Sequence, residues 1–556
     1  FPNSTYTTYT LQNGVAYCSG AQVLNAANSC QGVSIAETLT PYQIDQNVRY
    51  DALYAQDQYT MGRWTFQAAV RFDHAWSYYH DETVGGVRFL PGSITFAEND
   101  PALTTPSVAN CATIANTTSP GVALARANGC SNQVTGFKDL TPRGGVAWDV
   151  KGDGKTSVKV SIGKYLEAAS SGNGVYTSGN PVSRMPTGIG ISRSWNDVNK
   201  NFTPDCVLEN PLANGECGNL SNQAFGTPTF TNSFDSTLMG GWGVRPNDWG
   251  FVASVQQQLV ARTSVEFNYT RRWLANFVAT DNLATQAADY RPFTIVAPTD
   301  ARLGAASGTT VGTSAQPLYA ATQASALLTP NNFATLASNL GANQYQRFNG
   351  FLMNVQSRVR SGLTLSGGFN TGRTTADNCE VRAQIPELAG ASTTLTAPAV
   401  TASNPWCHLD TGWVTRATAL ASYVVPKIDV LASTTFRSDQ GGMLAANYLI
   451  PLSLAQAGGL VGTFANNVSP SVNLVQPGTL YGDRVNELDF KIAKIFRFSS
   501  MRLNAGLEIY NALNANATLT YNQTFNPAVP AGPGGWLQPT QVMTPRFFKL
   551  TAQFDF

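Results

Sequence analysis

Apolar and polar residues alternate at every second position through long stretches of the chain, which is the period of a β-strand. In WTFQAAVRFDHAWSYY, Trp64, Phe66 and Phe72 fall on one face of an extended chain. Gln67 and Arg71 fall on the other face, and the same split recurs in TSVKVSIGKYLE and SVEFNYTRRW. We find no convincing amphipathic helix of any length, so the pattern predicts an all-β protein.

The predicted strands are unusually long. They run to roughly 11 to 16 residues, whereas strands of globular sheets usually have five or six. A strand of this length can cross a bilayer with a tilt. We expect about thirteen of them, at 48–60, 63–79, 141–150, 156–168, 248–260, 264–275, 346–360, 362–373, 412–425, 428–438, 485–498, 501–512 and 542–556.

The connections alternate between short turns and long loops. The short turns are MGR, KGDGK, ART, SG, PK and SS. The long polar loops lie at about 80–140, 169–247, 276–345, 374–411, 439–484 and 513–541. Bacterial outer-membrane barrels have this organisation, with short periplasmic turns and long extracellular loops. We therefore expect a transmembrane, antiparallel, up-and-down β-barrel.

Aromatic residues gather near the ends of the predicted strands. Trp64 adjoins a short turn, and Trp76 and Tyr78 lie at the far end of the same strand. Phe496 and Phe498 precede another short turn. Rings in these places are typical of the girdles at the two membrane interfaces. The alternative is the apolar core of a soluble β-sandwich, which does not require rings at the strand ends.

The eight cysteines form four pairs of sequence neighbours, each within one polar segment rich in Gly and Asn. Four local disulfides are the economical interpretation, and they indicate an oxidising compartment. Eight free thiols in a reducing cytosol are the alternative, but free cysteines are usually buried among apolar residues. The expected pairs are Cys18 with Cys30, Cys111 with Cys130, Cys206 with Cys217, and Cys379 with Cys407.

The composition of the chain limits the kinds of partner and site that the sequence predicts. Charged residues make up 12% of the 556 residues and the net charge is +1, which gives no electrostatic reason to expect a nucleic-acid partner. The sequence contains no run of about 18 apolar residues, so it does not predict a membrane-spanning helix. With three histidines, no CxxC motif and no GxSxG elbow, we expect no metal site, no cofactor and no enzymatic activity. The GDGK segment lacks the further acidic residues of a calcium loop and is expected to be a turn.

Charged residues on the polar faces of the strands are expected to line a lumen. Some could contact a solute, but a hydrated wall of mutually paired charges is the simpler interpretation. In the outer loops, four aromatic residues could stack on a sugar or peptide, namely Trp242, Trp249, Tyr319 and Trp406. The sequence singles out no substrate-binding residue. The lumenal residues are Arg71, Asp73, Lys159, Glu167, Glu266, Arg272, Glu487, Asp489, Lys491, Arg502, Glu508, Lys549 and Asp555.

Three segments carry a resemblance to a known family: RYDALYAQDQYTMGRWTFQAAVRFD, LTPRGGVAWDVKGDGKTSVKVSIGKY and TPRFFKLTAQFDF. They resemble the barrel of TonB-dependent outer-membrane receptors, in particular the Oar-like branch, from about Val48 to Phe556. The resemblance implies 22 strands, a plug domain in the lumen, an amino-terminal extension and energy coupling through a TonB box. Phe554 and Phe556, on the last strand, resemble the carboxyl-terminal signal that barrel assembly machinery reads.

The sequence departs from the family in strand number. About thirteen strands are predicted where 22 are implied, and no plug or TonB box is recognisable. The first and last predicted strands both descend toward the periplasm, which places residues 1–47 outside the cell as a loop segment with a local disulfide. We expect residues 48–556 to be the carboxyl-terminal part of the barrel of a longer protein, which is either cleaved in that loop or represented only in part by these 556 residues. An open sheet would leave unpaired edges that a bilayer does not tolerate.

By resemblance, the leading function is that of a receptor that captures an unidentified oligosaccharide, peptide or metal chelate and transports it across the outer membrane of a Gram-negative bacterium. The partners implied are the plug, the remaining strands, the TonB complex, barrel assembly machinery and outer-membrane lipid. An alternative is a structural or adhesive barrel that binds partners through disulfide-stapled loops. A secreted β-rich enzyme or lectin would need a catalytic carboxylate pair or a repeat, and neither is evident.

Overall fold

The structure is a computed structural model of the 556-residue chain. It describes residues 4–11, 32–40, 47–78, 80–87, 89–98, 105–111, 114, 118–131, 136–169, 190–196, 198–199, 203–221, 223, 232–322, 331–360, 362–389, 405–465, 469–498 and 501–555.

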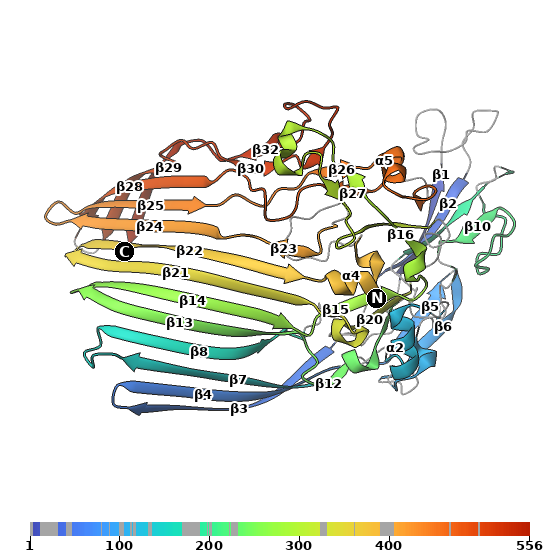
Figure 1. Ribbon diagram of the computed structural model, residues 1–556, viewed down its shortest axis with the longest axis horizontal. Helices are drawn as coiled ribbons and strands as arrows, with labels where there is room; N and C mark the ends of the chain where they lie inside the picture. Colours follow the sequence, from blue (N-terminus) through green and yellow to red (C-terminus); the bar gives the residue numbers. More distant parts are fainter. Residues whose placement is uncertain are drawn as a thin grey trace.

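One large antiparallel sheet dominates the structure (Figure 1). It has fifteen strands, of which β12 (Gly240–Trp242) and β23 (His408–Asp410) lie off the main path. The other thirteen pair with their neighbours along the chain, so the topology is up-and-down, as predicted. They are β3 (Asn47–Met61), β4 (Trp64–Tyr78), β7 (Gly136–Asp149), β8 (Thr156–Leu166), β13 (Asn247–Val260), β14 (Thr263–Ala275), β21 (Tyr345–Arg360), β22 (Leu363–Asp377), β24 (Val414–Val425), β25 (Val430–Asp439), β28 (Val485–Arg497), β29 (Arg502–Tyr510) and β33 (Phe547–Asp555).

Short turns join these strands at the left of Figure 1, and the long connections gather at the right. Gly62 has a φ of 60° between β3 and β4, a conformation that glycine adopts without steric cost. Between β7 and β8, the carboxylate of Asp149 accepts hydrogen bonds from the backbone N–H groups of Gly152 (2.9 Å) and Gly154 (2.8 Å). The GDGK segment therefore forms a turn.

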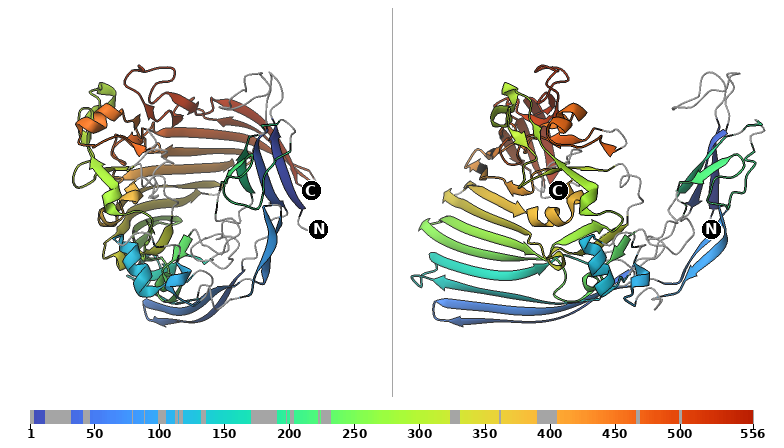
Figure 2. Two further views of the ribbon diagram at one scale, coloured as in Figure 1. Left: turned by 90° about the vertical axis from the view of Figure 1, so that its right-hand side faces the viewer. Right: turned by 45° about the vertical axis from the view of Figure 1, so that its right-hand side comes forward.

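The sheet curves into an open arc, and its two faces differ in chemistry (Figure 2). Arg437 on β25 lies opposite Glu487 on β28, and both line a hollow on the concave side. Residues of the other parity on β28 face the convex side, where the side chains of Phe490 and Ile492 are exposed. An apolar outer face and a polar inner face are the arrangement of a transmembrane barrel.

The last strand follows the same rule. Lys549 on β33 lies opposite Glu508 on β29, on the concave face. Phe548, Leu550 and Phe554 have the other parity, and Leu550 is 84% exposed. Three large apolar side chains on one open strand face are expected to meet lipid rather than water.

The long connections contain secondary structure and hydrophobic cores of their own, which the sequence pattern did not predict. The loops hold three short helices, α2 (Pro120–Asn128), α4 (Cys379–Gln384) and α5 (Leu452–Ala457), and the 3₁₀ turns η1 (Val108–Asn110), η3 (Ser236–Leu238), η4 (Ala287–Asp289), η5 (Ala301–Ala306), η6 (Ala337–Leu340) and η7 (Pro386–Ala389). In the described part of the chain, none of the helices has the length and apolar character that a membrane span requires.

Short strands pair into small sheets in the same region. The strands are β1 (Ser4–Leu11), β2 (Gly32–Thr40), β5 (Glu82–Val87), β6 (Leu90–Phe96), β9 (Gly190–Trp195), β10 (Cys217–Leu220), β11 (Asn232–Phe234), β15 (Val278–Asn282), β16 (Tyr290–Phe293), β17 (Ile295–Val296), β18 (Thr310–Val311), β19 (Leu318–Ala321), β20 (Asn332–Leu336), β26 (Asn447–Leu449), β27 (Ser471–Asn473), β30 (Thr518–Tyr521), β31 (Thr524–Phe525) and β32 (Pro539–Val542).

The largest hydrophobic core among the described residues lies in these loops. Phe293, Val472 and Phe525 are at most 3% exposed, and they come from three different connections. The indole N–H of Trp536 donates to the carbonyl of Ala445 over 2.9 Å, which joins two of these connections within the core. The residues are scattered over long sequence distances, so no local periodicity reveals them.

Residues 1–47 contribute two strands to one small sheet. β1 pairs with β2, β2 pairs with β9, and β9 pairs with β10, so the amino-terminal segment joins the connection between β8 and β13. This sheet stands apart from the main sheet in Figure 2. Cys18 and Cys30 lie outside the described residues, and the extracellular position of residues 1–47 stays a prediction.

Candidate functional site

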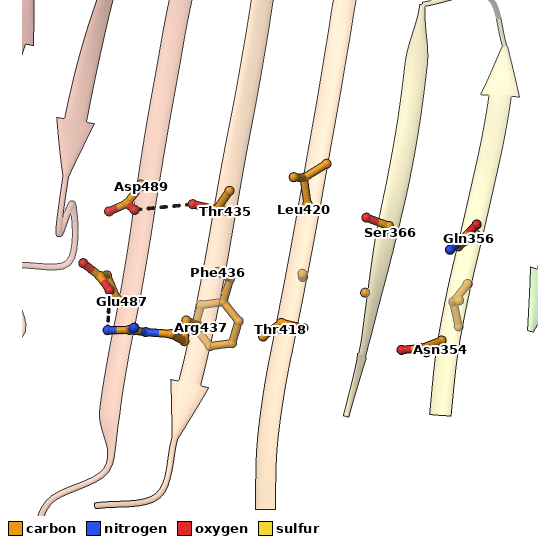
Figure 3. A pocket seen from close by; sticks show the side chains of 13 residues that line it. Asn354, Gln356, Ser366, Thr418, Leu420, Thr435, Phe436, Arg437, Glu487 and Asp489 are labelled. Atoms are coloured by element: carbon orange, nitrogen blue, oxygen red, sulfur yellow. Dashed lines mark hydrogen bonds and ion pairs between the residues drawn. The ribbon is translucent and has the colours of Figure 1, made fainter. Parts of the chain in front are cut away.

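A polar hollow of about 570 Å³ lies on the concave face of the main sheet, across β21, β22, β24, β25 and β28 (Figure 3). Amide and hydroxyl side chains supply one half of it, and charged side chains supply the other half. The polar lining consists of Asn354, Gln356, Ser366, Thr418, Thr435, Arg437, Glu487 and Asp489.

The charges of this hollow are paired across strands. The guanidinium of Arg437 lies 2.8 Å from a carboxylate oxygen of Glu487 and 3.4 Å from one of Asp439. Asp439 in turn lies 2.8 Å from Arg416 on β24. Asp489 accepts a 2.9 Å hydrogen bond from the backbone N–H of Asn511. The wall therefore presents charges of both signs at fixed positions, beside amide and hydroxyl groups that can form hydrogen bonds.

A second group of paired charges continues the wall toward the last strand. The ammonium of Lys491 lies 2.6 Å from one oxygen of Glu508. The hydroxyl of Tyr510 donates to the other oxygen over 2.7 Å, and Lys549 on β33 lies 3.9 Å from it. Glu508 thus links three adjacent strands on the concave face.

A third polar region lies on the opposite part of the arc, in a hollow of about 490 Å³. The guanidinium of Arg143 stacks 4.6 Å from the centre of the Tyr165 ring. Arg272 on β14 lies 2.6 Å from a carboxylate oxygen of Asp248 on β13. A ring beside a guanidinium can bind planar or anionic groups as well as water.

The registers place the predicted lumenal residues on the concave face. Arg71 lies 2.8 Å from Asp73, and the pairs formed by Arg272, Glu487, Lys491 and Lys549 are those described above. Ion pairs therefore involve some of these positions, whereas among the described residues no ion pair includes Lys159, Glu266, Asp489, Arg502 or Asp555. No individual substrate contact follows from these pairs.

Sequence reasoning missed a buried ion pair where β3, β7 and β13 meet the loops. Arg245 Nε donates to Asp139 Oδ2 over 2.7 Å, and the two side chains are 2% and 0% exposed. The Arg245 guanidinium lies 5.8 Å from the ring centres of Tyr50 and Phe137. The hydroxyl of Tyr50 donates to the carbonyl of Ala169 over 2.8 Å. Because these residues are far apart in the sequence, no motif signals the cluster.

Disulfides tie the loops at three of the four expected places. Cys111 joins Cys130 beside α2, Cys206 joins Cys217 beside β10, and Cys379 joins Cys407 beside α4. The fourth expected pair, Cys18 with Cys30, lies outside the described residues. Covalent closure of long loops restricts their unfolded conformations.

A pair of acidic side chains lies between β15 and η7 in the loops. Asp281 is 2% exposed, accepts a hydrogen bond from the backbone N–H of Gly121 over 2.6 Å, and is hydrogen-bonded to Glu387. Burial raises the pKa of Glu387 to about 7; the neighbouring Asp281 acts in the same direction, and the N–H of Asn282 opposes the shift. In the part of the chain that the structure describes, no group of three or more His, Cys, Asp or Glu residues could hold a metal ion.

The four aromatic residues considered for substrate stacking do not form one site. Trp406 packs against the loop core, and its indole N–H donates to the carbonyl of Asn473. Tyr319 on β19 is half-buried opposite Pro292. The expectation that these residues belong to outer loops was wrong for Trp249.

Two of the four rings lie on the outside of the main sheet. Trp249 on β13 stacks on Trp273 of β14, with 6.4 Å between the ring centres. Trp242 on β12 is 63% exposed and contacts Phe72 of β4. Both positions suit a membrane interface better than a solute site. Of the expected assembly signal, Phe554 is exposed and Phe556 lies outside the described residues, so its recognition stays a prediction.

Comparison with known proteins gives one sequence match and several structural ones. A search of curated proteins gives no match. The model of the family "TonB dependent receptor-like, beta-barrel" matches residues 3–204. No finding distinguishes the Oar-like branch within that family.

The solved structures that resemble the chain have low sequence identity to it. The outer membrane transporter YddB from Escherichia coli is 8% identical, with a TM-score of 0.37; the alignment covers 98% of this chain and 57% of that one. The ferric-catecholate import receptor Fiu from E. coli K12 is 11% identical, with a TM-score of 0.37 and coverages of 99% and 50%.

The copper transporter OprC is 10% identical, with a TM-score of 0.38 and coverages of 93% and 53%. The chain therefore spans about half the length of these solved structures. Over residues 3–204, the chain is similar to the β-barrel of TonB-dependent receptors.

Proposed function

We propose that this chain forms part of the barrel of an outer-membrane transporter that admits a polar solute through a channel walled by its concave face. The observation that carries the proposal is the division of the main sheet into a polar concave face and an apolar convex face. The family match over residues 3–204 supports the same reading.

The chemistry of the concave wall suggests the class of solute. Paired charges, amides and hydroxyls offer many weak hydrogen bonds and few unbalanced charges, as at Arg437 with Glu487 and at Lys491 with Glu508. Such a wall suits the passage of a hydrated oligosaccharide, peptide or metal chelate better than tight binding of an apolar molecule. Affinity for the solute then resides in the disulfide-tied loops.

The family also supplies the proposed partners. The transporter would be energised by a TonB complex, and a plug domain with further strands would complete the barrel around the wall. In this proposal residues 1–47 and the other long connections face the cell exterior, and residues 48–556 form the carboxyl-terminal part of the barrel.

Uptake can be tested without knowing the solute. Untargeted mass spectrometry of spent medium would compare the native strain, a strain with the gene deleted, and the deletion strain complemented with the wild-type gene. We expect one class of polar solute to be depleted in the first and third cultures only, and depletion to stop when a protonophore is added. Identical depletion profiles in all cultures, with the protein present in the outer membrane, would contradict the proposal.

Wall variants link uptake to the concave face. Replacing Glu487 and Asp489 together (Glu487→Gln with Asp489→Asn) removes two wall charges and should slow uptake of the identified solute severalfold. The matched control is Asp153→Asn, which removes an exposed carboxylate from the turn between β7 and β8 and should leave uptake unchanged.

A further inference from the structure

One row of side chains crosses four strands on the convex face, close to the loop end. Lys164 on β8 lies opposite Trp249 on β13, Trp249 lies opposite Trp273 on β14, and Trp273 lies opposite Arg347 on β21. A cation therefore stands at each end of a stacked tryptophan pair. Arg271 on β14 lies two residues from Trp273 on the same face, toward the turns. We call these five residues the cation–tryptophan row.

The cations of the row have no anionic partner among the described residues. No ion pair there joins Lys164, Arg271 or Arg347 to a carboxylate, although Arg373 on the next strand is paired with Asp410. Arg271 and Arg347 are exposed, and Lys164 is half-buried. The guanidinium of Arg347 lies 4.8 Å from the centre of the Tyr345 ring, which supplies no negative charge. Exposed cations without a carboxylate partner, beside a belt of aromatic side chains, call for an anion outside the chain.

The row lies at the edge of an aromatic belt. Toward the turns, the same face carries Phe251, Tyr269 and Phe351 on three adjoining strands. The ring centres of Phe251 and Tyr269 are 6.4 Å apart, and those of Tyr269 and Phe351 are 5.2 Å apart. Tryptophans at the edge of such a belt mark the depth of lipid headgroups. The ammonium and guanidinium groups are therefore at the depth of headgroup phosphates, rather than among acyl chains, where a charge would be costly.

We propose that the cation–tryptophan row binds the phosphates of a lipid headgroup in the outer leaflet of the membrane. The inference rests on the proposed outer-membrane location. Adjacent strands lie 4.7 to 4.9 Å apart, so Lys164 and Arg347 are separated by three spacings, or about 14 Å, with Arg271 between them. A headgroup with two phosphates can engage both ends of this span, and the indole rings can cover its sugar or acyl-linked atoms.

The binding test uses the full-length protein, purified in maltoside micelles and freed of lipid. Diphosphoryl lipid A is the probe, and native mass spectrometry over a lipid titration gives the apparent affinity. The variant K164Q/R271Q/R347Q removes the three cations, each worth roughly fivefold in binding to an anionic surface. We expect its affinity for the probe to fall on the order of a hundredfold.

Matched variants separate the site from charge and folding effects. R63Q/R262Q/K494Q removes three exposed cations near the turns and should bind as the wild type does. K164R/R271K/R347K keeps the charges and should retain most of the affinity. Heat-modifiable gel mobility shows whether each variant has folded. The proposal would be overturned if K164Q/R271Q/R347Q bound lipid A with the affinity of the wild type. It would also be overturned if R63Q/R262Q/K494Q lost as much affinity as K164Q/R271Q/R347Q.

Two further arms identify the ligand. A glycolipid of the same chain length without phosphate should not bind to the row, and excess inorganic phosphate should not displace lipid A. Binding of the phosphate-free lipid with equal affinity, or displacement by inorganic phosphate, would overturn the assignment to a lipid phosphate. Binding in micelles requires neither solute nor energy source, so a failed uptake test would leave this result standing. Recovery of the protein outside the membrane fraction would overturn the location on which both rest.

Discussion

At the scale of single residues, the buried pair of Arg245 and Asp139 fixes the junction between the main sheet and the loops. Two of its polar atoms, Asp139 Oδ1 and Arg245 Nη2, have no hydrogen-bond partner among the described residues. Breaking a buried ion pair leaves one charge uncompensated in a medium of low dielectric constant, whereas an exposed pair contributes little. The junction therefore depends on both side chains.

The pair makes a direct prediction about stability. Arg245→Met should lower the free energy of unfolding by about 3–5 kcal/mol, because Asp139 stays buried without its partner. The double variant Arg245→Met/Asp139→Leu should recover much of the loss. Denaturant titration in micelles measures each variant. The control Arg437→Met, in an exposed wall pair, should cost less than about 1 kcal/mol, and an equal loss for both arginines would contradict the account.

Glu387 makes the loops sensitive to pH. Its pKa is raised from 4.5 to about 7, so the folded loops bind a proton that the unfolded loops release. The resulting stability is fully present below about pH 4.5 and is lost as the pH rises through about 7. The wild-type loops should therefore resist protease better at pH 5 than at pH 8.

Neutral substitution tests this assignment. Glu387→Gln should flatten the pH dependence of protease resistance, because the side chain then carries no titrating group. Glu380→Gln, an exposed neighbour on α4, is the matched control and should keep the wild-type profile. A Glu387→Gln variant whose resistance still fell between pH 5 and 8 would assign the effect to another group.

At the scale of elements, all thirteen long strands could be predicted because each carries its own signal. Alternation within a strand needs no knowledge of distant residues. The errors are at the ends: β7 begins at Gly136 rather than 141, and β33 begins at Phe547 rather than 542. Val542 is the last residue of β32, not the first of β33. Pro545 lies between β32 and β33, where its lack of a backbone N–H breaks no strand pairing.

The loop elements could not be predicted for the opposite reason. β17 and β18 have two residues each, and Ile295 and Val311 are buried only because distant segments cover them. A strand of two residues has no detectable period. The candidate site divides in the same way: alternation placed Glu487 and Lys491 on the inner face, but nothing local revealed that Arg245 meets Asp139 or that Trp406 enters a core.

The disulfide between Cys379 and Cys407 should stabilise its loop independently of the sheet. It closes 28 residues, for which the chain-entropy model gives about 3–4 kcal/mol. The variant Cys379→Ser/Cys407→Ser should therefore be cut faster by trypsin within this loop. Its heat-modifiable mobility should match that of the wild type, because the main sheet does not depend on the crosslink. Loss of that mobility would show that loop and sheet unfold together.

At the scale of the whole molecule, one curved sheet separates two environments. Its concave face carries the paired charges from Arg71 to Lys549, and its convex face carries exposed aromatic and aliphatic side chains such as Phe267 and Leu550. In water, such an apolar surface would favour aggregation; in a bilayer it is solvated. The strand length, the two faces and the family match over residues 3–204 agree on a membrane barrel.

The alternation of environments along β14 is the most direct test of this account. Single cysteines placed at 264 to 270 would be spin-labelled in the full-length protein reconstituted in a bilayer, and relaxation by oxygen and by a water-soluble nickel complex would be measured at each site. We predict that Val265, Phe267 and Tyr269 report lipid, and that Ser264, Glu266, Asn268 and Thr270 report water, with a period of two. Equal access of the nickel complex to both sets would contradict the account.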